Sequence, residues 1–415
     1  MLPPVLEIYV VWHPGDMRGL HICNEFVEHF HGTVFSGLIG GAIEVYARSS
    51  GWQLADDAPR PIPLQTTGTQ SSSRPAQFIA IVPILGNEMA NAVQQKSQPW
   101  WQYIQNVVDS HDANPHRIGL FPYLLDDNAI KQTILGNALS RYQRIAANPV
   151  RDGDTEKSVR CRDLTQGIAQ LLSQPANKRL TVFISHTKRN SSGETENVET
   201  LIAAVREVIG TTRLQDFFDA NDLQPGQDWD QELRNMAAES ALLALRTDLY
   251  PSREWCQREV LISKREGMPV IIMDALGNAE ERGSFLMDHV PRVPARMENG
   301  CWRKADIIRG LNLLVDECLK RELWRHQAQL ARDELSFEIA WWAPHAPEPI
   351  TLTKWLENQR QVGTLSLSGD DLVILHPDPP LGADEKSVLQ EILLLAGIHR
   401  RLDVMTPRLL AARGG

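Results

Sequence analysis

Short apolar runs alternate with amphipathic or polar segments along the first third of the chain. A buried strand reads as an apolar run of about four to eight residues, whereas a helix places apolar residues at roughly every third or fourth position. By these patterns, strands are expected at residues 6–12, 78–83 and 117–121, and helices at 21–30 and 101–108. Residues 51–76 are rich in Pro, Ser, Thr and Gln, which predicts a long loop.

The middle of the chain repeats this alternation more regularly. Residues 197–209 carry an apolar stripe that is typical of an amphipathic helix. Asp228 followed by Gln231 has the pattern of a capping box and predicts the start of a further helix. Strands are expected at residues 181–185, 214–219, 241–245 and 270–273. Alternating strands and helices predict an α/β domain whose parallel sheet carries helices on both faces.

The last part of the chain opens with a long helical pattern at residues 303–334. Strand-like runs at 337–342 and 372–375 and a helix at 385–395 follow it. These elements are too few for a full doubly wound sheet, so we interpret them as a small α/β segment that could complete a neighbouring domain. The predicted divisions are an α/β domain at 1–150, a polar connector at 151–178 with an amphipathic stretch at 164–172, a second domain at 179–325 and the segment at 326–415.

The bulk composition narrows the class of protein. A chain of 415 residues is too long for one ordinary domain, and 42% hydrophobic with 23% charged residues is typical of a folded protein. The sequence has no apolar run long enough for a membrane span, and its first four residues do not open a secretory signal. The net charge of −10 makes direct nucleic-acid binding an unfavoured function, because neutralising phosphates requires clustered Lys and Arg.

The five cysteines show neither a CxxC pair nor the spacing of a metal site; they are Cys23, Cys161, Cys256, Cys301 and Cys318. An odd number of widely spaced cysteines fits a reducing compartment better than a disulfide framework. We therefore expect a cytoplasmic protein without a structural metal.

Four motifs in the middle of the chain point to a known family. They are Val-Phe-Ile-Ser-His at 182–186, the segment 217–229 around Pro225-Gly226, the segment 247–259 that ends in Trp255-x-x-x-Glu259, and the segment 264–275. In this order they resemble the first strand, the BB loop, the WxxxE helix and the following strand of bacterial TIR (Toll/interleukin-1 receptor) domains. The resemblance covers roughly a third of the chain. It implies a flavodoxin-like parallel sheet of the TIR type.

The resemblance also implies an activity, the cleavage of NAD⁺ with no further cofactor. Glu259 would be the catalytic carboxylate, Trp255 would shape the pocket, and Phe218 with the loop after the first strand would line the nucleotide site. Arg253 or Lys188 could meet the pyrophosphate. The full set of residues expected to bind substrate is Ile184, Ser185, His186, Thr187, Lys188, Phe218, Asp219, Trp229, Arg253 and Trp255.

Helix geometry supports a site at this place. Ser252 is a plausible N-cap and Glu254 in the first turn suits the helix dipole. Trp255 and Glu259 are four residues apart and share one helix face. This face would point to the carboxyl ends of the strands, where open α/β sheets bind ligands. A carboxylate there could stabilise the positive charge that develops on the ribose, while nicotinamide leaves as a neutral group without an acid.

Simpler interpretations stay open for each of these residues. Glu259 could be a solvated surface charge, and Trp255 would pack in the core whether or not the domain is an enzyme. Asp219 and Asp222 are common in turns, and His186 could be structural or contact a ligand. Many TIR domains are adaptors, so the alternative to an enzyme is a non-enzymatic scaffold that binds other TIR surfaces. Another class of nucleotide-processing hydrolase is disfavoured, because the sequence has no Gly-rich phosphate loop.

The first domain repeats the layout of the second. A strand is followed by His13-Pro14, and Trp101-x-x-x-Gln105 stands where the second domain has WxxxE. We interpret residues 1–150 as a divergent TIR-like domain in which a neutral amide replaces the carboxylate, so that it binds or assembles but does not cleave. The alternative is a chance spacing of Trp and Gln. The run 375–378 echoes residues 12–16 but is too short to count as a third repeat.

The resemblance implies a biological setting as well. Bacterial TIR proteins of this kind act in anti-phage defence, consuming NAD⁺ or making a cyclic ADP-ribose. Their sites are generally shared between two copies, so self-association through the loop around Pro225-Gly226 is expected, and monomers should be nearly silent. An upstream sensor protein or signal molecule is a further expected partner. The flanking segments would sense the trigger or drive assembly.

Overall fold

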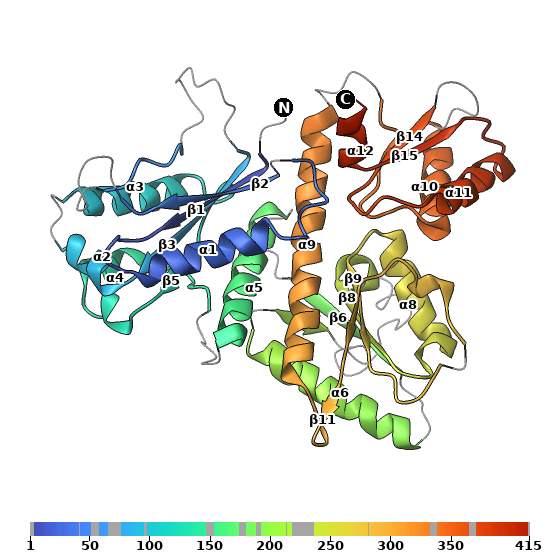
Figure 1. Cartoon of the computed structure of the whole chain (residues 1–415), viewed down its shortest axis with the longest axis horizontal. Helices are drawn as coiled ribbons and strands as arrows, with labels where there is room; N and C mark the ends of the chain where they lie inside the picture. Colours follow the sequence, from blue (N-terminus) through green and yellow to red (C-terminus); the bar gives the residue numbers. More distant parts are fainter. Residues whose placement is uncertain are drawn as a thin grey trace, which may run out of the picture. The chain divides into compact units, whose positions relative to one another are not determined.

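The structure is a computed structural model of the chain, shown in Figure 1. It divides into two compact units, Met1–Lys178 and Arg179–Gly415, which are described separately. The residues that it describes are 4–40, 42–50, 58–64, 76–94, 98–146, 153–173, 180–187, 192–212, 214–217, 236–280, 282–332, 338–364 and 371–413.

A parallel sheet forms the centre of the first unit. Its strands are β1 (Leu6–Val11), β2 (Ile43–Arg48), β3 (Phe78–Leu85), β4 (Ile118–Leu120) and β5 (Tyr123–Leu124). They follow the order β2-β1-β3-β4, and β5 pairs with the end of β3. Tyr9 of β1 is level with Tyr46 of β2 and with Ile81 of β3. The strand at β2 was not expected from the sequence.

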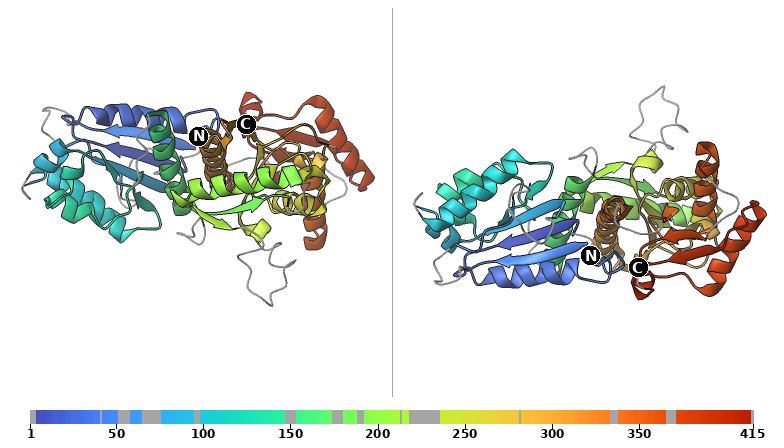
Figure 2. Two further views of the ribbon diagram at one scale, coloured as in Figure 1. Left: turned by 90° about the horizontal axis from the view of Figure 1, so that it is seen from below. Right: turned by 90° about the horizontal axis from the view of Figure 1, so that it is seen from above.

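Helices cover both faces of this sheet, as the two views of Figure 2 show. They are α1 (Arg18–Phe30), α2 (Asn87–Ala92), α3 (Pro99–Ala113), α4 (Ile134–Leu139) and α5 (Gly153–Leu172), with a short 3₁₀ turn, η1, at Asp127–Ala129. On one face, Trp100 and Ile104 of α3 pack against Tyr9 and Ile81. Helix α1 lies on the opposite face and contacts α5.

The segment predicted as a connector is a helix that belongs to the first unit. Leu164 and Ile168 of α5 are fully buried. The guanidinium of Arg160 is buried as well; it donates to the Glu25 carboxylate of α1 at 2.6 Å and to the Tyr123 hydroxyl at 2.7 Å. A buried ion pair of this kind ties α5 to α1 and to the sheet.

The second unit contains a five-stranded parallel sheet in the order β10-β9-β8-β6-β7. Its strands are β6 (Thr181–Ser185), β7 (Gln215–Phe217), β8 (Ala241–Arg246), β9 (Val270–Asp274) and β10 (Arg292–Pro294). Val182 and Ile184 face α6 (Ser192–Gly210) and α9 (Lys304–Arg332), whereas Phe183 and Leu242 face α8 (Glu254–Arg265). Two 3₁₀ turns, η2 (Tyr250–Ser252) and η3 (Phe285–Met287), and a hairpin of β11 (Met297–Glu298) and β12 (Cys301–Trp302) complete this part.

The two sheets share one topology. When the strands of each sheet are numbered in chain order, β6 to β10 follow the order 2-1-3-4-5, and β1 to β4 follow 2-1-3-4. This is the flavodoxin-like order of doubly wound α/β sheets. The predicted α/β class with parallel sheets is confirmed, and the repeated layout inferred from the sequence is present in the strand order.

A smaller parallel sheet lies at the end of the second unit. Its strands β13 (Trp341–Trp342), β14 (Leu372–Leu375) and β15 (Leu402–Met405) alternate with α10 (Pro349–Val362), α11 (Ala383–Leu395) and α12 (Pro407–Ala412). Leu352, Ile374 and Leu393 are among the residues of a hydrophobic core that belongs to this sheet. The segment therefore forms a sheet of its own instead of extending the neighbouring one. Helix α10, strand β15 and helix α12 were not expected.

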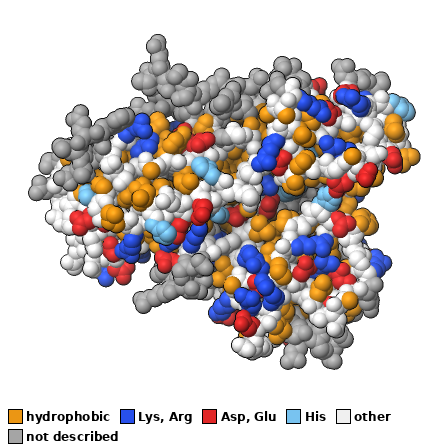
Figure 3. Space-filling model, viewed as in Figure 1, with side chains coloured by type: hydrophobic (Ala, Val, Ile, Leu, Met, Phe, Trp, Pro, Cys, Tyr) orange, Lys and Arg blue, Asp and Glu red, His pale blue; other side chains and the backbone are white. Residues whose placement is uncertain are grey.

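The surface of the described residues is mixed in character. On the face seen in Figure 3, Lys and Arg side chains are interspersed with Asp and Glu, so that face is not uniformly basic. Within the described ranges, no helix combines the length and the apolar character that crossing a bilayer demands.

Replacing Arg160 with Met should destabilise the first unit by about 3–5 kcal/mol, because Glu25 would keep a buried charge without its partner. Native-state hydrogen exchange of β1 and β3 in the full chain measures this loss. The matched control is Lys157→Met on the same helix, whose pair with Glu28 is solvent-exposed and should contribute little to stability. Equal effects of the two variants would mean that the buried pair of Arg160 and Glu25 stabilises the unit no more than an exposed pair does.

Candidate functional site

The topological switch point of the larger sheet in the second unit lies between β6 and β8. From these neighbouring strands the chain leaves to opposite faces, to α6 after β6 and to α8 after β8. Open α/β sheets bind ligands at the carboxyl ends of the strands on either side of such a point. Here the hydroxyls of Thr187, after β6, and Thr247, after β8, approach to 3.4 Å in the buried interior.

Glu259 reaches this place from α8. Its side chain is 94% removed from solvent in an otherwise mostly polar helix, since only 6% of the residue is exposed. The hydroxyl of Ser185, the last residue of β6, donates to the Glu259 carboxylate. The Ser185 hydroxyl also lies 2.5 Å from the hydroxyl of Tyr250, in the turn η2. A strand end, a turn and a helix are thus joined by one buried polar cluster.

Burial sets the charge state of this cluster. It raises the pKa of Tyr250 well above the usual value, and the nearby Cys256 and Glu259 raise it further, while the hydrogen bond with Ser185 lowers it. Tyr250 therefore stays protonated at physiological pH and offers a neutral hydroxyl beside the carboxylate. Neither Tyr250 nor Thr247 was singled out in the sequence analysis, although both lie in the segment that carries the WxxxE motif.

The outer rim of the site contains Trp255. It was expected to pack in the core, and this was wrong: the side chain is 42% exposed, and the Arg258 guanidinium lies 4.9 Å from the centre of its ring. Trp255 is one helical turn nearer to the start of α8 than Glu259. Arg253 occupies the N-cap position of α8 and is half-buried.

The prediction of Ser252 as the N-cap of this helix was also wrong. Ser252 ends the turn η2, and its hydroxyl donates to the Leu249 carbonyl at 2.8 Å. The helix begins one residue later than expected, at Glu254, which does lie in the first turn. The Tyr250 side chain, which belongs to the turn η2, is buried in the hydrophobic core on the α8 side of the sheet.

The loops after β8 and β9 are held by charged side chains. Arg246, at the end of β8, pairs with Asp274 at 2.8 Å and with Glu280. Asp248 accepts hydrogen bonds from the backbone amides of Gly277 and Asn278, each at 2.9 Å. These contacts hold the loops on the β9 side of the site. They also pair Arg246 with two carboxylates, so it is not a candidate for binding an anion.

The remaining predicted residues fall into three groups. Ser185 and Thr187 are buried at the switch point, and His186 is half-buried between them with its Nδ1 3.0 Å from the Thr187 carbonyl oxygen. Ile184 lies in the hydrophobic core on the α6 side of the sheet, so its side chain packs on the face opposite to α8. Lys188, Phe218, Asp219, Asp222, Pro225-Gly226, Trp229 and the predicted helix start at Asp228 lie outside the described residues.

The proposed counterpart in the first unit does not have the same geometry. Gln105 donates to Asp109 of its own helix at 2.6 Å, and the face of α3 that packs on the sheet carries Trp100 and Ile104. The ring of Trp100 lies 5.3 Å from that of His13, after β1. In the first unit, an aromatic contact joins α3 to the end of β1. In the second unit, the hydrogen bond between Ser185 and Glu259 joins α8 to the end of β6. Gln105 takes no part in the contact with β1, so it is not an amide substitute for the Glu259 carboxylate.

Comparisons with known proteins give little further information. No protein-family model matches the chain, and no curated protein matches it. Among solved structures, the TIR domains of the activated Roq1 resistosome, which recognises the pathogen effector XopQ, match 52% of this chain and 99% of theirs, at 17% identity and a TM-score of 0.20. A protein described as a phosphosugar isomerase from Silicibacter pomeroyi DSS-3 matches 78% and 88%, at 9% identity and a TM-score of 0.20. At such scores neither match supports an argument, so the fold and the site rest on the strand order and the contacts given above.

Replacing Ser185 with Ala should lower the free energy of unfolding of the second unit by about 1–3 kcal/mol, because Glu259 and Tyr250 would both lose a buried hydrogen-bond partner. Denaturant unfolding of the full chain measures the change. Ser252→Ala is the matched control, because this exposed hydroxyl donates a local hydrogen bond to the Leu249 carbonyl of the same turn. If the two variants were equally stable, the cluster around Glu259 would not hold the strand and helix together.

Proposed function

We propose that the second unit cleaves the N-glycosidic bond of NAD⁺ and that Glu259 is the catalytic residue. The observation that carries this proposal is the carboxylate of Glu259 at the topological switch point, buried and held by the hydroxyl of Ser185. The motif resemblance to TIR domains leads to the same residue. One line of support comes from sequence spacing and the other from side-chain contacts.

The reaction needs little more than such a carboxylate. The bond between ribose C1′ and the nicotinamide nitrogen breaks, both electrons pass to that nitrogen, and the cationic ring leaves as neutral nicotinamide. The ribose becomes an oxocarbenium ion, which water attacks with loss of a proton to give ADP-ribose; attack by an adenine nitrogen would give a cyclic ADP-ribose. A carboxylate in a site of low dielectric stabilises that ion more strongly than it would in water.

The neighbours of Glu259 suit this role. The Ser185 hydroxyl donates to the carboxylate, and a ribose hydroxyl could take its place as donor. Tyr250 remains neutral, so it adds no competing negative charge. Trp255 offers an exposed aromatic face, and Arg253 at the start of α8 is one of the two predicted partners for the pyrophosphate. Ser185 and Tyr250 are positioning residues in this scheme.

The biological setting is part of the same proposal. The motif resemblance supports a bacterial anti-phage effector that becomes active when copies associate through the loop around Pro225-Gly226. The first unit would then bind or assemble and would not cleave, since α3 carries an aromatic contact where α8 carries Glu259. A sensor protein or signal molecule would provide the trigger.

Purified full-length chain should release nicotinamide from NAD⁺, and Glu259→Gln should reduce the rate at least about 100-fold because the amide cannot stabilise the oxocarbenium charge. The matched control is Glu254→Gln on the same helix, whose side chain is 86% exposed and whose loss should leave the rate nearly unchanged. Chromatography of the products separates ADP-ribose from a cyclic product. Equal loss in both variants would indicate damage to α8 and not removal of a catalytic group.

The specific activity should also rise with protein concentration, because a site completed by a second copy is populated only in the associated state. Nicotinamide release across a dilution series, compared with the oligomer fraction from light scattering, measures this. A specific activity that stays constant while the oligomer dissociates would show that one copy suffices. If assembled protein releases no nicotinamide at all, the non-enzymatic scaffold becomes the better interpretation.

A further inference from the structure

A cavity of about 330 Å³ lies at the carboxyl ends of the strands in the smaller sheet of the second unit. Pro344 and His345, after β13, and Pro377, after β14, form part of its wall. Other parts of the wall come from α9 and from the amino ends of β9 and β10. Glu259 lies at the carboxyl ends of the larger sheet, so the cavity is a separate site. Its volume is at the lower end of the range for small-molecule sites, which favours a ligand of one or two rings.

Two ion pairs line the cavity and use both of its lysines. Lys264 pairs with Glu348 at 2.8 Å, and Lys320 pairs with Glu317 at 3.7 Å. The four side chains are largely buried. A charged ligand that took one member of a pair would leave the other buried without a counter-charge, which is strongly unfavourable. The ion pairs therefore disfavour both an anion and a cation as the ligand.

The remaining ionisable side chains of the cavity do not change this balance. Asp378 lies 2.9 Å from the Arg408 guanidinium, which offsets its charge, although its two oxygens make no hydrogen bond within the described part of the chain. His289 lies 3.1 Å from the Glu385 carboxylate. Burial, with smaller contributions from nearby positive charges, lowers the pKa of His345 to about 3, so its ring is neutral at physiological pH. An uncharged ligand fits this set of groups best.

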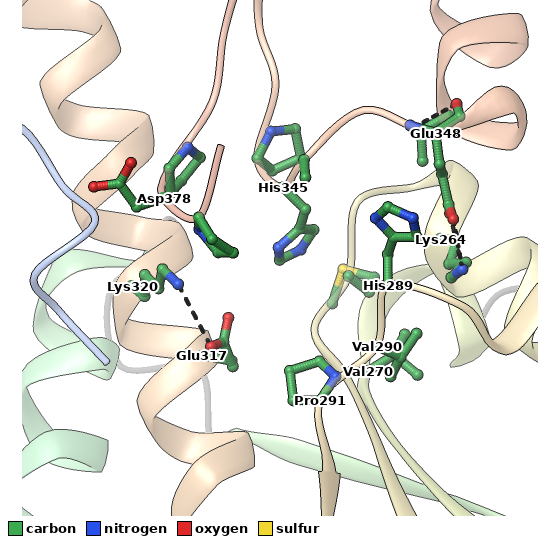
Figure 4. A pocket seen from close by; sticks show the side chains of 16 residues that line it. Lys264, Val270, His289, Val290, Pro291, Glu317, Lys320, His345, Glu348 and Asp378 are labelled. Atoms are coloured by element: carbon green, nitrogen blue, oxygen red, sulfur yellow. Dashed lines mark hydrogen bonds and ion pairs between the residues drawn. The ribbon is translucent and has the colours of Figure 1, made fainter. Parts of the chain in front are cut away.

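His345 offers such a ligand a polar atom that has no partner. Its ring points into the space between α9, with Glu317 and Lys320, and the loop that carries His289 (Figure 4). Its Nε2 atom is buried and makes no hydrogen bond to the residues that the structure describes. A neutral imidazole has one donor and one acceptor nitrogen, so Nε2 can pair with an uncharged group of either kind. Because buried polar atoms are almost always paired, a ligand that reaches Nε2 removes an exception.

The pair of Lys320 and Glu317 is open enough to accept a group between its members. An ammonium and a carboxylate in a direct hydrogen bond are about 2.7–2.9 Å apart, and the separation here is 3.7 Å. An amide can bridge them, because its carbonyl oxygen accepts from the Lys320 ammonium and its N–H donates to the Glu317 carboxylate. Each charge then gains a hydrogen bond and keeps its counter-charge nearby. An amide therefore needs no surplus charge in the cavity.

The rest of the wall suits a planar ring. Apart from the polar groups described above, most of the lining residues are apolar, namely Met268, Val270, Val290, Ala346 and four prolines. An adjoining hollow of about 190 Å³ shares His345 with the cavity and is lined by Trp341 and Trp355, whose stacked rings have centres 5.5 Å apart. Apolar and aromatic walls with a few convergent polar groups are the usual composition of a small-molecule site.

We propose that this cavity binds an uncharged heteroaromatic amide, with its carbonyl on Lys320, its N–H on Glu317 and its ring against the apolar walls. A further polar atom of the ring pairs with Nε2 of His345. Two kinds of compound share this chemistry: nicotinamide, whose amide is a substituent, and nucleobases such as uracil, whose amide lies within the ring. The binding does not rest on the NAD⁺-cleaving activity proposed above, although nicotinamide would be a product of that activity.

Isothermal titration calorimetry of the full chain with nicotinamide and with uracil tests the binding. At least one of the two should bind with a dissociation constant below about 1 mM. Acetylpyridine keeps the ring and the carbonyl of nicotinamide but has no N–H, and nicotinic acid replaces the amide with a carboxylate. Dimethyluracil, methylated on both nitrogens, is the corresponding control for uracil. Each control compound should bind at least about tenfold more weakly than its parent amide.

Two variants test the place of binding. Lys320→Met removes the donor for the carbonyl, and Ala346→Leu fills part of the cavity; each should weaken the binding about tenfold or more. The matched controls are Lys304→Met, which removes an exposed amine from the same helix, and Ala383→Leu at the exposed start of α11. Both controls should bind like the wild type. Circular dichroism of each variant confirms that a loss of binding is not a loss of fold.

The proposal is overturned if neither amide binds with a dissociation constant below about 1 mM, if the control compounds bind as tightly as the amides, or if Lys320→Met and Ala346→Leu bind like their controls. Glu259→Gln should leave the affinity unchanged. A loss of binding in that variant would place the ligand at the NAD⁺ site and overturn the proposal as well. None of these titrations contains NAD⁺, so a failure of the proposed function and a failure of this inference give different results.

Discussion

The arrangement of the candidate site depends on the cost of burying the Glu259 carboxylate. A carboxylate taken out of water needs hydrogen-bond donors, and leaving it without them costs more than most contacts in the domain contribute. Ser185 supplies a donor from the end of β6, and Tyr250 stands against the same hydroxyl. Because these three side chains come from a strand, a turn and a helix, satisfying one charge fixes how α8 lies against the carboxyl end of the sheet. A site that positions a carboxylate so firmly also keeps it dehydrated, which is the condition under which it best stabilises a developing positive charge.

Much of the fold was predictable because its central strands are buried on both faces. Such strands read as continuous apolar runs, and β6, β8 and β9 were located almost to the residue on that basis. The edge strand β2 pairs only with β1 and is half-buried, so its sequence lacks this signal. Helix α10 was missed for another reason: after its Pro it opens with Ile, Thr and Thr in close succession, and β-branched residues favour strands. At its start the Thr351 hydroxyl accepts a hydrogen bond from the Glu348 backbone amide at 3.1 Å, a cap that was not recognised in the sequence.

The candidate site was predicted in part. The motif spacing identified Glu259 and Ser185, which meet in the structure, but spacing alone could not rank the residues around them. Trp255 was expected in the core, yet its side chain in the first turn of α8 is exposed. Ile184 alternates with Ser185 along β6, so one of the two must face away from the site. Gln105 in the first unit shows that residue spacing is not enough. A Trp and a Gln four residues apart share one face of a helix, but the spacing does not say whether that face packs on the sheet.

Helix α8 carries two buried charged side chains that contact different parts of the second unit. Near its middle Glu259 is buried against the larger sheet, and in its last turn Lys264 is buried beside the smaller one. Both side chains belong to one helix of twelve residues, so the ion pair of Lys264 with Glu348 and the hydrogen bond of Glu259 with Ser185 hold the same element. Ser185 and Glu259 are in hydrogen-bond contact, and such a contact is sensitive to small displacements. Helix α8 therefore places Glu259 at the larger sheet and, through Lys264, is attached to Glu348 at the start of α10, which packs on the smaller sheet.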